Sequence, residues 1–130
     1  MKRTVIVSIL ALAIVFGSVS AAFGVTQDYS IVLPRFSGDA YTSAKTVNGN
    51  KYFSVKHMYS GNKPVRFAVC NTSRQPISSA ITLYPGGTAA PTTVLWKNPT
   101  ATAQSIVVRL DSATFNTVKI LAQGTWVWNY

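Results

Sequence analysis

Hydrophobic and polar residues alternate with a period of two along most of this chain. From residue 29 onward, short runs of β-branched and aromatic residues are separated by clusters of Gly, Pro, Asn and Ser. A turn signal every ~8 to 14 residues is typical of a sandwich or barrel. The expected fold class is all-β: an antiparallel two-sheet sandwich of about eight short strands. The strands are predicted near residues 29–35, 41–47, 51–60, 65–71, 77–84, 92–97, 105–111 and 117–128.

The first 22 residues have the layout of a secretory signal peptide. Lys2 and Arg3 precede an apolar run from Val5 to Phe16 that only Ser8 interrupts, and small residues follow as far as Ala22. We therefore predict a helical signal peptide at residues 1–22 and a β-sandwich domain at residues 23–130. The expected location is extracellular. An uncleaved anchor is the alternative, since about 20 apolar residues can span a bilayer; no later stretch is apolar enough to do so.

The net charge is strongly positive. The chain contains twelve Lys and Arg residues, three Asp and no Glu. Without Lys2 and Arg3, ten basic residues remain against three acidic ones, so the predicted domain has a net charge of +7. Such a charge attracts polyanions and negatively charged surfaces at long range. Outside a cell, these include anionic cell-wall polymers, glycans and membrane surfaces, whereas solubility through positive charge is the simpler alternative.

The titratable residues are few and argue against several kinds of site. Cys70 is the single cysteine and His57 the single histidine, too few for a usual zinc site. Asp28, Asp39 and Asp111 lie far apart in the chain, which disfavours a glycosidase carboxylate pair and an acid that orients His57. We expect no catalytic residue, no metal and no cofactor. The protein is accordingly predicted not to be an enzyme, and His57 is predicted to be structural.

The dipeptide Asn48-Gly49 is the clearest turn signal in the chain. Asn-Gly fits the two positive-φ positions of a type I′ turn, which joins neighbouring antiparallel strands. In that hairpin Lys45 lies opposite Tyr52, so tyrosines and lysines share one solvated face. A short loop at residues 61–63 would pair the next strand and complete the sheet. Its inner face would carry Phe53, Val55, His57, Tyr59, Val65, Phe67 and Val69, and its outer face Tyr41, Lys45, Tyr52, Lys56, Met58, Arg66 and Cys70.

This outer face is the candidate binding surface. Aromatic and basic side chains interleaved on a sheet resemble a platform on which rings stack and cations pair with anionic groups. Cross-strand Tyr and Lys pairs also stabilise ordinary solvated sheets, and this structural interpretation stays open. The candidate binding residues are Tyr41, Lys45, Tyr52, Lys56 and Arg66, with Trp128 as an outlying sixth.

The chain ends in the segment GTWVWNY, which gives Trp128 its place among the candidates. In a strand, Trp126, Trp128 and Tyr130 project from one face. The same row continues backward through Ala122 and Ile120, which favours burial of Trp126 in the core. For Trp128 and Tyr130 a core position and an exposed sugar-stacking platform both remain open.

Three stretches resemble certain short secreted proteins of Gram-positive bacteria, which form uncharacterised families loosely akin to the lactococcin-type sandwich bacteriocins. These stretches are Ile31-Val32-Leu33-Pro34, Tyr41-Thr42-Ser43-Ala44-Lys45-Thr46 and Gly124-Thr125-Trp126. The resemblance implies export by a Gram-positive cell and an eight-strand sandwich. It assigns no catalytic residue.

Together these observations predict a secreted, cationic binding protein that acts at the cell exterior on anionic or glycan components of the envelope. The alternative function is a bacteriocin-like toxin that perturbs a competitor's envelope. A structural protein that assembles through its sheet edges is a third hypothesis. No motif for specific nucleic-acid recognition is evident, and the oligomeric state stays open.

Overall fold

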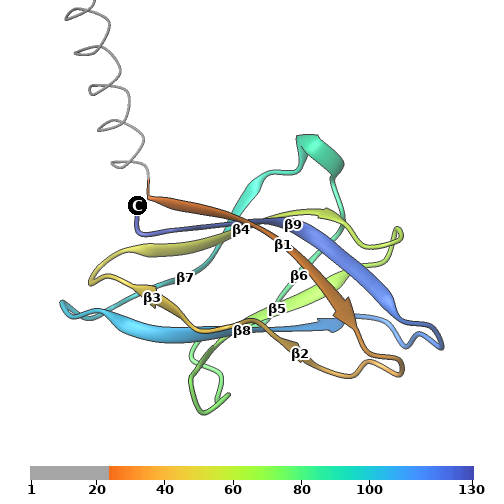
Figure 1. Cartoon of the computed structure of the whole chain (residues 1–130), viewed down its shortest axis with the longest axis horizontal. Coiled ribbons are helices and arrows are strands. Elements are labelled where there is room, and N and C mark those ends of the chain that lie inside the picture. Colours follow the sequence, from red (N-terminus) through yellow and green to blue (C-terminus); the bar gives the residue numbers. More distant parts are fainter. Residues whose placement is uncertain (1–23) are drawn as a thin grey trace, which may run out of the picture.

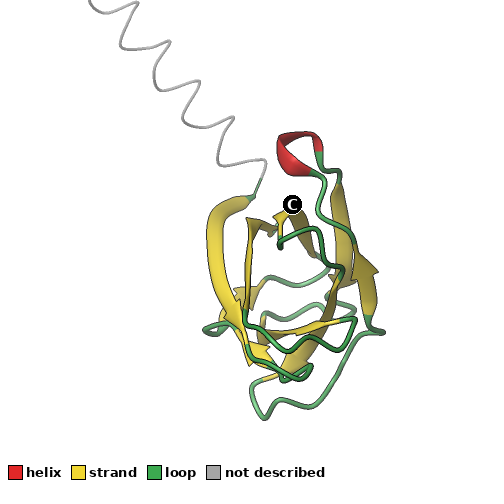
Figure 2. Ribbon diagram, turned by 90° about the vertical axis from the view of Figure 1, so that its right-hand side faces the viewer, coloured by secondary structure: helices red, strands yellow, loops and turns green. Residues whose placement is uncertain are grey.

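The computed structural model describes residues 24–130, so the predicted signal peptide at residues 1–22 lies outside the described residues. The described chain forms two antiparallel sheets packed face to face (Figure 1, Figure 2), which confirms the predicted fold class. Sheet A has the order β1-β9-β4-β7, and sheet B has the order β2-β8-β5-β6, with β3 also paired to β8. The elements are β1 (Val25–Leu33), β2 (Ala40–Tyr41), β3 (Lys45–Val47), β4 (Tyr52–Tyr59), β5 (Val65–Asn71), β6 (Ile81–Leu83), the 3₁₀ turn η1 (Gly87–Ala89), β7 (Thr92–Lys97), β8 (Gln104–Ser112) and β9 (Ile120–Trp128).

Strand β9 shows how alternation builds the sandwich. Its side chains alternate between the interior and the outer face of sheet A along its whole length. Trp126 is 2% exposed and Trp128 is 8% exposed, so both indoles belong to the core. The alternation therefore places Trp128 in the core and excludes an exposed platform at that ring.

Trp126 lies at the centre of an aromatic core. Its ring stacks on Tyr29 with centroids 4.2 Å apart, and it contacts Phe53 at 5.6 Å and Phe67 at 6.1 Å. Phe53 also stacks on Trp128 at 5.9 Å. Because β5 carries Phe67 and belongs to the other sheet, these contacts hold the two layers together.

The predicted hairpin at Asn48-Gly49 is wrong. Strand β3 pairs with β8 in sheet B, whereas β4 pairs with β7 and β9 in sheet A. Residues 48–51 therefore carry the chain from one sheet to the other. The positive φ of this turn falls on Asn50, at 57°, and not on Gly49. Glycine is needed at position 49 for space, because a Cβ there would overlap the carbonyl of Ala101.

A buried amide fixes this crossover. The side chain of Asn98 is inaccessible to solvent, and its Nδ2 donates to the carbonyls of Val47 and Asn48, each at 3.1 Å, and of Thr102 at 2.8 Å. The backbone N–H of Asn50 donates to the Thr100 carbonyl at 3.0 Å. Asn98 and Thr100 lie about fifty residues downstream of the turn, so the dipeptide Asn48-Gly49 alone could not indicate these contacts.

The loop at residues 61–64 is also a crossover between sheets. Its predicted role as a hairpin is wrong, because β4 and β5 face each other across the core and do not pair. The predicted inner face is nevertheless buried at Phe53, Val55, His57, Val65, Phe67 and Val69. The His57 and Phe67 rings meet at 5.2 Å as partners across the two layers. Tyr59 is exposed, because the register of β4 against β9 shifts between His57 and Tyr59.

Cys70 points to the outer face of sheet B, as predicted for its side of β5, but it is fully buried. Arg74, in the loop after β5, places its guanidinium 4.3 Å from the ring centroid of Tyr41 on β2. Since β5 and β2 flank β8, this contact spans the outer face above the β8 strand. The outer face of sheet B, which the predicted hairpin left open to solvent, is therefore partly covered, and Cys70 on it has no exposed surface.

Candidate functional site

The six predicted binding residues do not share one surface. They are distributed over both sheets: Tyr41 on β2, Lys45 on β3, Tyr52 and Lys56 on β4, Arg66 on β5, and Trp128 in β9 with its ring in the core. The single Tyr and Lys face depended on the hairpin at residues 48–49, and it disappears with that hairpin. The structure does bring two of the six together, because the Lys45 ammonium lies 5.8 Å from the centroid of the Trp128 ring.

Several of the other candidates contact neighbours on their own sheet. Tyr52 stacks on Tyr130 at 5.5 Å, and the ammonium of Lys97 lies 5.4 Å from the Tyr52 ring centroid. The Arg66 guanidinium pairs with the buried carboxylate of Asp111 at 3.0 Å. That ion pair neutralises the Arg66 charge, so Arg66 has little attraction left for an anionic ligand.

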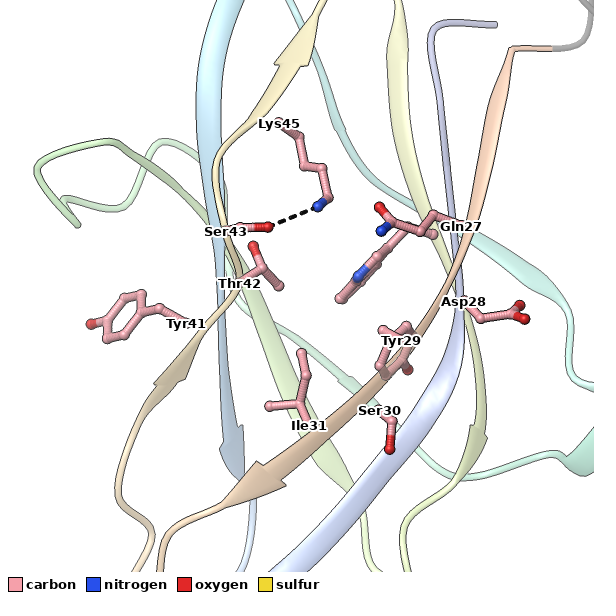
Figure 3. Close-up of a pocket in the computed structure, with 10 residues that line it drawn as sticks. Gln27, Asp28, Tyr29, Ser30, Ile31, Tyr41, Thr42, Ser43 and Lys45 are labelled. Atoms are coloured by element: carbon pink, nitrogen blue, oxygen red, sulfur yellow. Dashed lines mark hydrogen bonds between the residues drawn. The ribbon is translucent and has the colours of Figure 1, made fainter.

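A pocket of about 250 Å³ lies where the two sheets separate at one edge. One side is β1, the edge strand of sheet A, and the other is the β2–β3 edge of sheet B (Figure 3). We call it the edge pocket. Its lining residues are Gln27, Asp28, Tyr29, Ser30, Ile31, Tyr41, Thr42, Ser43, Lys45 and Trp126.

A break in the edge strand shapes the pocket. Thr42 donates its backbone N–H to the Val108 carbonyl, and the Val108 N–H donates to Thr42 Oγ1, both at 3.0 Å. The Val108 N–H therefore bonds to the Thr42 hydroxyl instead of to a backbone carbonyl, and the edge strand is interrupted between β2 and β3. Ser43 lies in this gap, and its hydroxyl faces the space between the sheets (Figure 3).

The pocket floor is aromatic and rigid. Tyr29 and Trp126 stack with an interplanar angle of 23°, and both are otherwise packed in the core. Ile31 continues the apolar floor along β1. Rings fixed in this way lose little conformational freedom when they contact a ligand.

The pocket rim is polar and carries a cation. Lys45 is paired with the buried residue Ile106 in the β3–β8 register, so its side chain leans toward the interior side of the sheet edge. Its ammonium donates to Ser43 Oγ at 3.1 Å, and in Figure 3 it points into the gap, toward Gln27. Asp28 points the other way, and its carboxylate accepts from Thr125 Oγ1 at 3.3 Å. The positive charge at the mouth is therefore not matched by that carboxylate.

A buried hydrogen-bond chain supports the floor. The Tyr29 hydroxyl donates to Nδ1 of His57 at 2.9 Å, and His57 Nε2 donates to Ser60 Oγ at 2.8 Å. The Ser60 hydroxyl in turn donates to the Lys63 carbonyl, which fixes the direction of the chain. Burial lowers the pKa of His57 to about 4 and raises that of Tyr29. His57 is thus a neutral residue with both ring nitrogens bonded, as predicted for a structural histidine.

Tyr41 and Lys45 were predicted for an outer sheet face that the structure does not have, although both line the edge pocket; Gln27, Tyr29, Thr42, Ser43 and Trp126 were not predicted as binding residues. The pocket depends on β1 and β3 facing each other from different sheets. No turn motif or periodicity encodes that proximity. The one signal present in the sequence was the YTSAK segment, in which polar residues interrupt a predicted strand.

Comparisons with known proteins identify no family for this chain. No family model matches it, and no curated protein matches it. Among solved structures, a family two carbohydrate esterase from Cellvibrio japonicus aligns with a TM-score of 0.38 and 12% identity. The alignment covers 82% of this chain and 35% of the esterase, so this chain spans about a third of that structure. The likeness is too low to support any functional argument.

Two further features bear on the site. Within residues 24–130, the side chains of His, Cys, Asp and Glu form no group of three that could hold a metal ion. In the same part of the chain, the structure contains no helix with the length and apolar character that a membrane span requires.

Proposed function

We propose that the protein is a secreted binding protein of the cell exterior whose edge pocket takes one anionic sugar unit of an envelope glycan. The observation that carries the proposal is the Lys45 ammonium, held at the mouth of a pocket whose floor is the Tyr29 and Trp126 pair. A few convergent polar groups over an apolar floor are the usual composition of a small-ligand site. Here the role is binding rather than catalysis.

The chemistry of the lining favours a sugar with a negative substituent. The apolar face of a pyranose can lie against the edges of aromatic rings, while its hydroxyls exchange hydrogen bonds with Gln27 and Ser43. A carboxylate or phosphate on the sugar would meet Lys45, which is partly withdrawn from water and therefore attracts it more strongly than an exposed lysine. The pocket volume of about 250 Å³ suits one sugar unit, with the rest of the polymer outside.

The overall charge supports the same partner class. Residues 24–130 carry ten basic and three acidic side chains, a net charge of +7. This charge would raise the rate of encounter with an anionic polymer, and the pocket would supply the selectivity. Salt should therefore slow association more than it weakens the final contact.

The direct test is adsorption of the protein to isolated Gram-positive cell walls. Lys45→Glu should lower the affinity about tenfold or more, because it reverses the charge at the pocket mouth. The matched control is Lys63→Glu, which makes the same charge change at an exposed position in the β4–β5 crossover. Equal losses for the two variants would show that only total charge matters and would contradict a role for the edge pocket.

A further inference from the structure

Two loops meet at the end of the sandwich where β1 ends and β9 begins. The loop between β1 and β2, residues 34–39, lies beside the loop between β8 and β9, residues 113–119 (Figure 1). The backbone N–H of Phe36 donates to the Asn116 carbonyl at 2.8 Å, and Ser37 Oγ donates to the Thr114 carbonyl at 3.1 Å. We call the two loops together the loop tip.

The loop tip exposes large apolar side chains. Phe36 is 60% exposed, Phe115 is 70% exposed, and their ring centroids are 5.5 Å apart. Val118, in the second loop, is 62% exposed. Single exposed apolar residues are common, but a cluster on two touching loops is typical of an interaction surface.

The loops are held in this arrangement by their backbones and by buried polar contacts. Phe36 and Ser37 have φ values of 61° and 57°, in the left-handed region that a bulky residue rarely adopts. Asn116 is buried, and its Nδ2 donates to the Thr114 carbonyl at 2.8 Å and also bonds to Ser112 Oγ. A rare backbone conformation persists only where the surrounding contacts require it, so the outward position of Phe36 is a fixed property of the fold.

The charge around the rings is mainly positive. Arg35 and Lys119 flank the apolar residues, and both are exposed. The acidic residue of these loops, Asp39, directly precedes β2 and stands at the base of the first loop. The apolar residues protrude from the end of the molecule with cations beside them.

We propose that the loop tip docks onto an anionic lipid bilayer, a role that goes beyond glycan binding at the edge pocket. Phe36, Phe115 and Val118 enter the boundary between headgroups and acyl chains, where amphipathic surfaces with cationic rims bind. Arg35 and Lys119 remain at the level of the phosphates. The exposed rings suit the apolar part of this boundary, and the flanking cations match the charge of the lipid.

The test is cosedimentation of the proposed secreted form, residues 23–130, with vesicles of phosphatidylcholine alone or with about one third phosphatidylglycerol. The chain should bind the anionic vesicles and bind the neutral ones far more weakly. Phe36→Ala combined with Phe115→Ala should lower the partition coefficient about tenfold or more. Tyr84→Ala is the matched control, since Tyr84 is 73% exposed on another loop, and it should change binding less than about twofold.

The charge and the insertion are tested separately. Arg35→Glu should weaken binding to anionic vesicles more than Lys51→Glu does, although both change the net charge equally. The emission of a Trp introduced by Phe115→Trp should be quenched by lipids with brominated acyl chains. Binding that survives loss of both phenylalanines, the absence of any vesicle binding, or a Phe115→Trp emission that these lipids leave unchanged would overturn the proposal. Dependence of a protein complex on the same rings, without vesicle binding, would also overturn it.

Discussion

The Tyr29 hydroxyl lies 2.9 Å from Nδ1 of His57, although the two residues belong to strands that are separated by β9. Gly124 of β9 is the register partner of both residues. The tyrosine therefore reaches across a whole strand at the one position without a side chain. This bond ties β1, the strand that forms one side of the edge pocket, to the centre of sheet A.

We predict that Gly124→Ala destabilises the fold by about 3 kcal/mol. An added Cβ would lie 2.7 Å from the Tyr29 hydroxyl oxygen and would overlap the carbonyl of Lys56, which is backbone and cannot rotate away. Urea denaturation measures the change in the free energy of unfolding. Gly61→Ala is the control: unlike Gly124, Gly61 has a positive φ, at 58°, but its surroundings are open, so a cost of about 1 kcal/mol is expected from backbone conformation alone. A smaller cost at Gly124 than at Gly61 would contradict the close passage of the Tyr29 side chain over Gly124.

Stability should fall as the pH is lowered from about 6.5 to about 4. Burial depresses the pKa of His57 from 6.5 to about 4 in the folded state, so the unfolded chain binds more protons between these values. The expected loss is roughly 3 kcal/mol, complete near the folded pKa. Urea unfolding at several pH values measures it. In His57→Gln the loss across this window should shrink to what the carboxylates contribute; an unchanged loss would rule out His57 as its source.

The crossover from β3 to β4 should depend on the buried Asn98 amide. Asn98→Ala removes the amide that donates to the carbonyls of Val47, Asn48 and Thr102, of which Thr102 keeps a second donor in Thr100 Oγ1, and should cost about 2 to 3 kcal/mol. Gln104→Ala removes an amide that donates to Thr100 at the surface and should cost less than about 1 kcal/mol. Amide hydrogen exchange should also rise at Asn50 in the first variant. Comparable costs for the two variants would contradict the anchoring role.

Cys70 should resist thiol reagents in the native protein. Its side chain is buried and burial raises the pKa of its thiol, so little reactive thiolate forms near neutral pH. Arg74→Ala removes the contact that spans the outer face from β5 to Tyr41 and should speed labelling by about tenfold. Arg35→Ala removes the same charge from the loop between β1 and β2, so it should leave the rate of Cys70 labelling unaltered. Fast labelling of the unmodified protein would show that the outer face of sheet B is open.

Local pattern was enough to predict the layers but not their connections. Alternation predicted the burial of Phe53, Val55, Phe67 and Val69, because the side on which a strand residue points is a local property. Pairing is not local. The dipeptide Asn48-Gly49 is compatible with a hairpin as well as with a crossover between the sheets. Contacts with the distant residues Asn98 and Ala101 decide for the crossover.

The candidate site was predicted only in part for the same reason. Lys45 was predicted from a hairpin register that the structure does not have, and it lines the edge pocket for a different reason, its pairing with Ile106 of β8. Its neighbour across the pocket, Gln27, lies on β1 in the other sheet, and the floor residue Trp126 lies on β9. A site formed between two sheets depends on their packing, which no short segment specifies.

The most direct test of the edge pocket is a titration of ¹⁵N-labelled protein followed by NMR chemical shifts. The probes are N-acetylmuramic acid, which carries a carboxylate, and glucose 6-phosphate, with neutral N-acetylglucosamine as the control. At least one anionic probe should shift the signals of Gln27, Ser43, Lys45 and the Trp126 indole together, more than the neutral sugar does, and Lys45→Met should abolish the difference. Shifts located elsewhere, or no shifts with either anionic probe, would contradict the proposed binding site.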